Sequence, residues 1–240
     1  MSPTTRRFTV GALFAFTIGF VFTGCATAPA QTARATSAPI AAPENCCNAL
    51  ERAVLDELNR ARTNPARYAD MLESELPYYH GTLFREPGES VPLQTREGAS
   101  AMREAIRALR ATPPLPAFRL SAGMTLGARD HVRDQASRGL MNHKGTDGSM
   151  AWDRVDRYGA WQSKVSENMS FGPMTARDVV TALLVDDGIA DRGHRKNILD
   201  RDVRVVGIAC GPHKTYRVMC DIVHAAGFTE RQTAVVGNRE

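Results

Sequence analysis

The stretch that most constrains the fold lies near the C-terminal end, where residues 203–228 read "VRVVGIACGPHKTYRVMCDIVHAAGF". It is rich in Val and Ile on both sides of a break at Gly211 and Pro212. β-Branched residues that flank one turn-forming break predict two strands joined as an antiparallel hairpin. Strands that follow each other directly, after a run of helices, indicate an α+β fold and not the alternating strands and helices of a parallel sheet.

Upstream of this hairpin, apolar residues recur at spacings of three and four, which is the period of one helix face. The helices expected from this spacing and from capping residues begin near Asn45, at Asn64-Pro65, around Met102, after Ser121 and after Thr175. The segments 76–98 and 142–150 are rich in Gly, Pro or polar turn residues and are expected to be loops.

The N-terminal segment predicts export. Two arginines precede residues 8–22, which carry no charge. Such a run is too short to span a membrane comfortably and has the length of a signal-peptide core. The following "FTGC" is similar to a bacterial lipobox, so we expect lipidation of Cys25, with cleavage after Ala28 and a soluble secreted form as the alternative. Either way we expect a secreted protein, in the cell envelope or outside the cell.

Composition divides the rest of the chain. The residues after Cys25 are mainly Ala, Thr and Pro, which cannot form a packed core and indicate a flexible tether. The "TPPLP" stretch at 112–116 ends the third helix and is the candidate domain boundary. The predicted units are a signal peptide at 1–24, the tether at 25–44, a helical extension at 45–112, the main domain at 113–228 and a tail at 229–240.

Charge excludes one class of partner. The formal net charge is +4, and two of the basic residues lie in the segment that we expect to be removed. A nearly neutral mature chain lacks the electrostatic field that nucleic-acid-binding proteins present. We therefore expect no nucleic-acid partner.

Four further cysteines follow the N-terminal segment: Cys46, Cys47, Cys210 and Cys220. An exported chain permits disulfides, and four cysteines allow three connectivities. If the hairpin turn lies at residues 212–214, Cys210 and Cys220 are not opposite each other, so we expect bridges from the Cys46-Cys47 pair to the hairpin. Four buried thiols are the alternative. No CxxC spacing exists, so the cysteines are not expected to bind zinc.

The order of the polar motifs carries a family resemblance. A long helix is followed by a loop with His143, by "SENMSFG" with Glu167, by a helix ending in Asp186-Asp187, and by "RGHRKNIL" with His194, just before the hairpin. This order resembles the CAP superfamily, which comprises cysteine-rich secretory proteins, antigen 5 and pathogenesis-related proteins. It is most similar to the bacterial SCP-like extracellular proteins. The resemblance covers about residues 117–228 and leaves 45–111 outside it.

The resemblance implies a three-layer α-β-α sandwich, here with an N-terminal helical extension, and a central cleft lined by two histidines and two acids. Position by position, these are His143, Glu167, His194 and the acid that ends the third helix of the family's fold. Asp186 matches that acid best, and Asp187 stays open as the alternative. Many relatives have Glu there, and a shorter carboxylate reaches about one methylene less.

Such a set of residues suits three roles. His143 and His194 could hold zinc or another divalent cation, with Glu167 and Asp186 as carboxylate partners that orient the imidazoles. The same four residues are the candidates for general acid–base catalysis. They could also only stabilise the fold. Ser166 lacks the Gly-x-Ser-x-Gly elbow of a serine nucleophile, so catalysis is the less favoured role.

We therefore expect an exported, lipid-anchored module that binds a small apolar ligand or a cell-envelope component and contacts the membrane through Cys25. Lipid and sterol binding are what the resemblance implies for some relatives. One alternative is a metal-assisted or His/Glu-based hydrolase of peptide or envelope polymer. The other is a structural scaffold in which the four residues stabilise the fold.

Three neighbouring residues receive structural interpretations. Asn168 is expected to hydrogen-bond backbone near the cleft. Arg195 is expected to pair with Asp186 or Asp187. His131, in the middle of the long helix, is expected at the surface.

Overall fold

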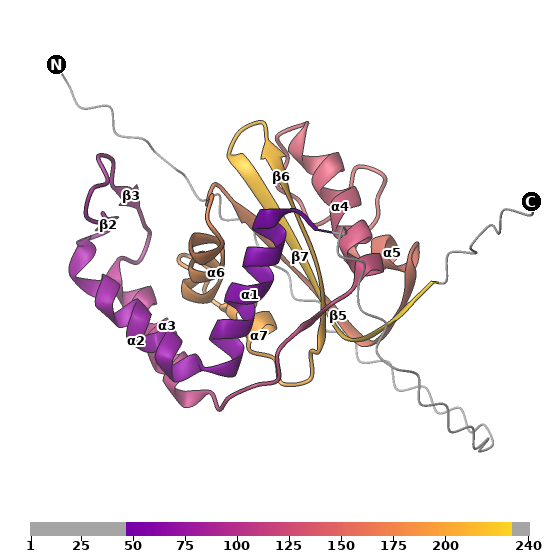
Figure 1. Ribbon diagram of the computed structural model, residues 1–240. Helices are drawn as coiled ribbons and strands as arrows, with labels where there is room; N and C mark the ends of the chain where they lie inside the picture. The colour runs from indigo at the N-terminus through magenta and orange to yellow at the C-terminus, as the bar shows by residue number, and fades with distance from the viewer. Residues whose placement is uncertain (1–46, 232–240) are drawn as a thin grey trace, which may run out of the picture.

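The computed structural model describes residues 47–231 (Figure 1). The predicted signal peptide, the lipidation site Cys25, the tether and Cys46 lie outside these residues. Within 47–231, none of the helices is both long enough and apolar enough to cross a membrane.

A four-stranded sheet lies at the centre of the molecule. Its strands, in spatial order, are β4 (Arg119–Leu120), β6 (Val205–His213), β7 (Arg217–Glu230) and β5 (Gly159–Phe171). β4 pairs in parallel with the start of β6, and the other neighbours are antiparallel. β5 is therefore an edge strand, and it pairs with β7 over most of its length.

Helices cover both faces of this sheet, as Figure 1 shows with the sheet lying between two groups of helices. One face carries α4 (Ala122–Ala136) and α5 (Ala151–Asp156). The other carries α1 (Ala49–Thr63), α6 (Ala176–Val185) and α7 (Gly193–Ile198), with α2 (Pro65–Glu75) and α3 (Ala99–Ala111) packed outside them. The predicted α-β-α sandwich is confirmed.

Side-chain caps begin α2, α4 and α6 at the residues expected from the sequence, and α1, expected near Asn45, begins after Asn48. The capping residues are Asn48 of α1, Asn64 of α2, Ser121 of α4 and Thr175 of α6. Each side-chain oxygen accepts a hydrogen bond from a backbone N–H of the first turn, which would otherwise have no partner. The helices expected around Met102 and over 175–185 are confirmed as α3 and α6.

The sheet separates two apolar cores, because successive strand residues point to opposite faces. Val223 and Ala225 of β7 pack toward α4 and α5, whereas Cys220 and Ile222 pack toward α1 and α6. The second core also takes in side chains of α2 and α3. Residues 49–111 thus share one apolar core with this face of the sheet. The domain boundary at residue 112 stays a prediction.

Several parts of the fold differ from the sequence-based expectation, and the short elements β4 and α7 are among those that were not predicted. The predicted loop at 76–98 contains a short 3₁₀ helix (Leu76–Tyr78) and a small antiparallel sheet. Its strands are β1 (Tyr79–His80), β2 (Leu83–Phe84) and β3 (Leu93–Gln94). β5 and α5 were not predicted, because neither has a clear apolar period: much of β5 faces solvent as an edge strand, and α5 has only six residues.

The expected disulfide pattern is wrong. The hairpin turn lies at residues 214–216, two residues later than assumed, and this register places Cys210 directly opposite Cys220. The two cysteines form a disulfide with a Cα–Cα distance of 4.1 Å. Both hairpin cysteines are thereby used, so neither Cys46 nor the buried Cys47 can bridge to the hairpin.

Candidate functional site

The first half of the site joins the His143 loop to the edge strand β5. His143 Nδ1 lies 2.8 Å from Glu167 Oε2. The other oxygen of Glu167 accepts a hydrogen bond from Arg154 of α5, which is itself buried. The Glu167 side chain is 4% exposed and the His143 side chain 36% exposed, so a buried carboxylate holds a partly exposed ring.

The charge of Glu167 follows from these contacts. Burial by itself raises the pKa of a carboxyl group, but the hydrogen bond from His143 and the positive charge of Arg154 outweigh it and lower the pKa of Glu167. An ionised carboxylate can only accept hydrogen bonds. His143 Nδ1 therefore carries the proton.

The second half of the site forms where α6 ends. Asp186 follows the last helical residue and adopts a left-handed conformation with φ 57°, which Asp tolerates better than most residues. Its carboxylate accepts hydrogen bonds from the backbone N of His194 at 2.9 Å and from His194 Nδ1 at 2.7 Å. The Asp186 side chain is 2% exposed and that of His194 is 19% exposed.

The structure places Asp187 elsewhere. Its carboxylate accepts hydrogen bonds from the backbone N–H groups of Arg96 and Glu97, at 2.6 and 2.8 Å. Of the two adjacent acids, Asp186 is thus the one that contacts His194.

The edge strand β5 links the two halves. Glu167 and Asn168 are consecutive, so their side chains point to opposite faces of the sheet. Asn168 is fully buried and donates from Nδ2 to the carbonyl oxygen of His194 at 3.1 Å, while its own Oδ1 accepts from Asn197 Nδ2 at 2.8 Å. The expected bond from Asn168 to backbone is confirmed.

Both imidazoles are presented in the same chemical form. Each Nδ1 is engaged by a carboxylate, and among residues 47–231 the Nε2 atom of neither ring takes part in a hydrogen bond. A neutral imidazole whose Nδ1 carries the proton has its lone pair on Nε2. Such a carboxylate-bound histidine can ligate a metal through Nε2 or accept a proton there.

The carboxylates themselves are not available as further ligands. Glu167 accepts hydrogen bonds from His143 and Arg154, and Asp186 accepts them from two groups of His194. In the part of the chain that the structure describes, no group of three or more His, Cys, Asp or Glu side chains is arranged to hold a metal ion. Each imidazole could by itself offer Nε2 to a metal, with its carboxylate orienting the ring.

Buried polar residues behind His143 were not identified from the sequence. Asp221 of β7 is fully buried, and burial together with the charge of Glu167 raises its pKa well above the ordinary value. Ionisation of Glu167 therefore disfavours ionisation of Asp221. Strand alternation places Asp221 on the face opposite Cys220, and nothing in the sequence marked it as buried there. Nothing marked Arg154 either, because α5 was not predicted.

Two interpretations of single residues are wrong. His131 is fully buried, lies 2.9 Å through Nε2 from the carbonyl oxygen of Asn142, and has its pKa lowered by burial. It belongs to the face of α4 that lies against the sheet. Arg195 pairs through its guanidinium with Glu104 of α3, at 2.9 Å, and not with Asp186 or Asp187.

A shallow groove with a volume of about 640 Å³ lies near the turn of the hairpin, where α1, α4 and β6 meet. Its lining includes Asn48 and Glu51 of α1, Arg129 of α4 and Cys210 of β6. None of the His–carboxylate pairs borders it. The concave surface and the polar pairs are thus separate features of the molecule.

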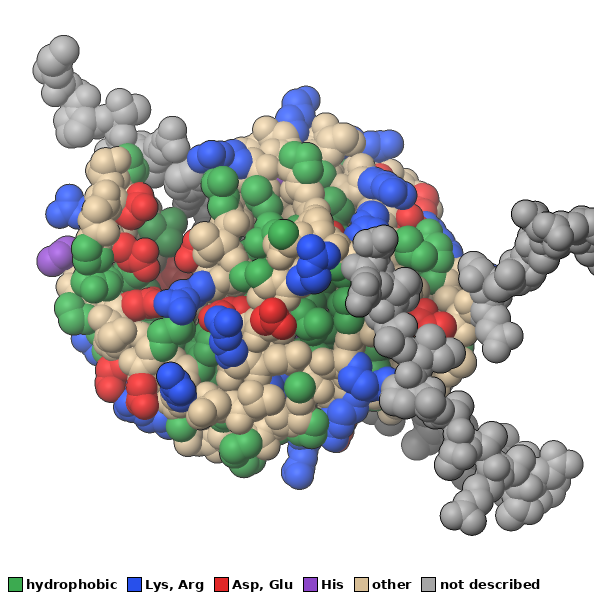
Figure 2. Space-filling view, in the orientation of Figure 1, with side chains coloured by type: hydrophobic (Ala, Val, Ile, Leu, Met, Phe, Trp, Pro, Cys, Tyr) green, Lys and Arg blue, Asp and Glu red, His purple; other side chains and the backbone are tan. Residues whose placement is uncertain are grey.

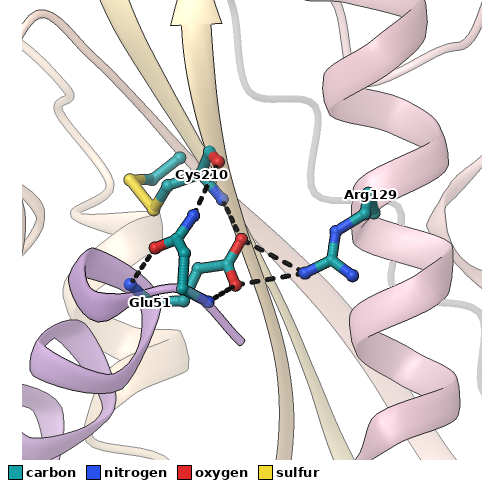
Figure 3. Close-up of a disulfide and its surroundings, with 5 residues drawn as sticks. Glu51, Arg129 and Cys210 are labelled. Atoms are coloured by element: carbon teal, nitrogen blue, oxygen red, sulfur yellow. Dashed lines mark hydrogen bonds and ion pairs between the residues drawn. A yellow bond between two sulfur atoms is a disulfide. The ribbon is translucent and has the colours of Figure 1, made fainter. Parts of the chain in front are cut away.

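Figure 3 shows how α1 is anchored at this groove, beside the disulfide. The carboxylate of Glu51 accepts hydrogen bonds from the backbone N of Cys210 at 2.9 Å, from Arg129 at 3.1 Å and from the backbone N of Asn48 at 2.7 Å. Asn48 in turn donates to the carbonyl oxygen of Cys210 at 3.3 Å. β4 pairs only with the first residues of β6, so side chains of α1 satisfy backbone groups of β6 that no strand reaches.

The surface carries no field of one sign on the face shown in Figure 2. Lys and Arg side chains are interspersed there with Asp and Glu side chains. Such a mixture attracts neither nucleic acid nor an anionic membrane strongly.

The model of the cysteine-rich secretory protein family, CAP, matches residues 103–223. No curated protein is significantly similar in sequence to the chain.

Several solved structures are similar at low identity. An outer surface protein from Borrelia burgdorferi is 14% identical with a TM-score of 0.40, over 46% of this chain and 78% of that one. An extracellular protein containing an SCP domain from Bacillus anthracis is 17% identical with a TM-score of 0.36, over 51% of this chain and 38% of that one. NaASP2, crystallised with Zn²⁺, is 13% identical with a TM-score of 0.37, over 76% of this chain and 81% of that one. At these values the likeness carries no functional information.

Proposed function

The chain belongs to the cysteine-rich secretory protein (CAP) family, and we propose that it is an exported binding module that holds a divalent cation through His143 and His194. The cation of choice is zinc, for which neutral imidazole is a good ligand. The module would act at the cell envelope or outside the cell. Its predicted anchor is a lipid on Cys25, and a soluble secreted form is the alternative.

One observation carries this proposal. Each imidazole is bound at Nδ1 by a carboxylate that is almost fully buried, while the ring itself reaches solvent. A carboxylate in this position fixes the ring and selects the tautomer with its lone pair on Nε2. A histidine that only stabilised the fold would not need an Nε2 atom to which no group of residues 47–231 is hydrogen-bonded.

The roles of the chain's own residues follow. His143 and His194 would supply the ligand atoms, and Glu167 and Asp186 would orient them. The hydrogen bond from His143 and the charge of Arg154 outweigh burial and lower the pKa of Glu167, so that the carboxylate accepts a hydrogen bond from Nδ1–H. A bound cation would supply Lewis acidity toward an oxygen atom of a bound partner. With only two protein ligands we expect modest affinity and room for a small ligand or a cell-envelope component.

Zinc titration of the purified protein by calorimetry tests the proposal. Wild type is compared with a His143→Ala/His194→Ala variant, and the His80→Ala variant serves as the control, because His80 is exposed in the small sheet. We expect saturable binding by wild type and the control, and at least a tenfold weaker affinity in the double variant. No binding by folded wild type would contradict the metal-binding function.

The geometry also suits a second candidate, a hydrolase of peptide or envelope polymer. A lone pair on Nε2 that is backed by a carboxylate is the arrangement of a general base acting on water. This function predicts product release from such a polymer and its loss in His143→Ala, with the melting temperature unchanged. A scaffold role predicts the opposite result, a lower melting temperature and no other loss.

A further inference from the structure

The segment that carries the second half of the site has little regular structure of its own. Between the end of α6 and the start of α7, residues 186–192 form only turns. Asp186 and Arg192 both have left-handed backbone conformations, with φ 57° and 53°. Non-glycine residues adopt this conformation only where the surroundings determine it. The position of His194 therefore depends on whatever holds this segment.

Arg192 holds the segment from within. Its guanidinium donates from Nη1 to the carbonyl oxygens of Asp186 at 2.8 Å and Ile189 at 3.0 Å. These bonds connect the two ends of the turn that separates Asp186 from His194. The residue is 9% exposed, so its charge requires partners inside the protein.

Those partners come from the chain before residue 112. Both oxygens of Glu97 bind Arg192, at 2.6 Å to Nη1 and 2.7 Å to Nη2. Glu104 of α3 binds the other edge of the same guanidinium, at 2.7 Å to Nη2 and 3.1 Å to Nε. The hydrogen bond from Arg192 is the main cause that lowers the pKa of Glu104 to about 2. The hydrogen bond from Arg192 likewise lowers the pKa of Glu97. The two carboxylates are thus ionised at neutral pH, and Arg192 together with Arg195 balances their charge.

Arg195, three residues after Arg192, also joins Glu104 to backbone carbonyl groups at the end of α6. It donates from Nη1 to the second oxygen of Glu104 at 2.9 Å. Its other nitrogens donate to the carbonyl oxygens of Leu184 at 2.5 Å and Val185 at 3.0 Å, which are the last residues of α6. Two guanidinium groups, on either side of His194 in the sequence, therefore bind the end of α6 while α3 binds them.

The contact is reciprocal. The backbone N–H of Gly188 donates to Glu97 at 2.6 Å, and the carboxylate of Asp187 accepts from the backbone of Arg96 and Glu97. Main chain and side chains of residues 96–104 and 186–195 hold each other.

We infer that Glu97 and Glu104 are positioning residues for His194: through Arg192 and Arg195 they fix the segment 186–195 so that the Asp186 carboxylate meets His194 Nδ1. The inference rests on the proposed function, in which His194 presents Nε2 to a ligand. Glu97 lies before the residues that match the family model, so a segment outside that match completes this half of the site.

The other half of the site supplies an internal reference. His143 is held by Glu167 and by a loop whose carbonyl groups accept from Arg154, and none of these groups touches residues 96–104. A change in Glu97 or Glu104 should therefore alter His194 and leave His143 as it is.

The tautomer of each histidine is the property to measure, by ¹⁵N NMR of the imidazoles at a pH where both are neutral. No metal is added, so the result does not depend on whether the protein binds zinc. We expect both rings to carry the proton on Nδ1 in wild type. In Glu97→Gln/Glu104→Gln, the ratio of Nδ1–H to Nε2–H at His194 should fall about tenfold, the effect of losing one charge-assisted hydrogen bond, with His143 unchanged.

The control variant is Arg110→Gln, which removes an exposed ion pair of the same helix with Asp70 and Glu73 and should leave both histidines unchanged. If the double variant does not fold, Glu104→Gln alone is measured in the same way. A folded variant, recognised by an unchanged His143, in which His194 keeps the wild-type tautomer ratio would overturn the inference.

Discussion

The two faces of the sheet hold an imidazole against a carboxylate by different means. On the α4 and α5 face, Glu167 is fixed within a strand and neutralised by the buried Arg154. On the α6 and α7 face, Asp186 lies in a segment of turns and is placed by arginines that residues 96–104 bind. The first arrangement depends on one buried ion pair, and the second on several partly exposed ones. We therefore expect one substitution in the first half to lower the free energy of unfolding more than one substitution in the second half.

Removing Arg154 should have the largest effect. Arg154→Met leaves the Glu167 carboxylate buried with only His143 as a partner, and an uncompensated buried charge costs about 3–5 kcal/mol of the free energy of unfolding. Chemical denaturation measures this loss. The matched control is Arg157→Met three residues later, whose ion pairs with Asp130 and Asp147 are exposed and should contribute no more than about 1 kcal/mol. Equal losses in the two variants would contradict the contrast between the faces.

Removing Arg192 should cost less. In Arg192→Met, the Glu97 and Glu104 side chains, which are about a third exposed, regain hydrogen bonds from water, while carbonyl groups of the turn lose theirs. We expect a loss of about 2 kcal/mol in the free energy of unfolding, together with a change at His194 and none at His143. Denaturation and imidazole NMR on one sample check both. A loss in the free energy of unfolding as large as that of Arg154→Met would contradict the expected difference between the two halves of the site.

His224, on the α1 and α6 face, makes the free energy of unfolding depend on pH in the acid range. It is fully buried against Phe118, and burial, followed by the charge of Arg62, lowers its pKa to about 3 from an ordinary value of 6.5. Its stabilising contribution is present above pH 6.5 and is lost as the pH falls toward 3, by about 2 kcal/mol between pH 7 and 5. Denaturation at several pH values should show this slope in wild type and a weaker one in His224→Leu. His80→Leu, at an exposed position, should keep the wild-type slope.

Asp221, on the α4 and α5 face, provides a pH dependence of the opposite sign. Its folded-state pKa is raised, so the stability linked to it is present below the unfolded-state value of 3.8 and is lost as the pH rises toward the folded-state value. Asp221→Asn removes this loss. The variant's melting temperature relative to wild type should rise between pH 4 and 8, because the unfolded wild-type chain loses the Asp221 proton at lower pH than the folded one does. A constant difference over this range would show that Asp221 does not take up a proton on folding.

How far the sequence could predict the site depended on the range of the interactions. The motif order brought His143, Glu167, Asp186 and His194 into consideration, because these residues lie in separate short segments that can be recognised one by one. The groups that position them, Arg154 and the pair Glu97 and Glu104, carry no local signal. A salt bridge partner can come from any point in the chain, and only the packing of helices selects it.

The disulfide shows the same limit for the register of a single pair of strands. Both strands of the hairpin were predicted, but the pairing of Cys210 with Cys220 depends on which residues form the turn. A turn two residues earlier would place each cysteine opposite a different residue. Residue preferences locate strands to within a few positions, and that is not sufficient to define a register.

The sequence by itself determined the longer helices, the caps at Asn64, Ser121 and Thr175, the hairpin and the family to which the chain belongs. These features follow from periodicity, from side chains that bond their own first turn, and from motifs read in order. Only the tertiary structure decided that Asp186 and not Asp187 meets His194, that Arg154 lies behind Glu167, and that residues 96–104 hold the segment of His194. Such choices depend on burial, because the energy of a charged group is set by all the groups that surround it and not by its neighbours in sequence.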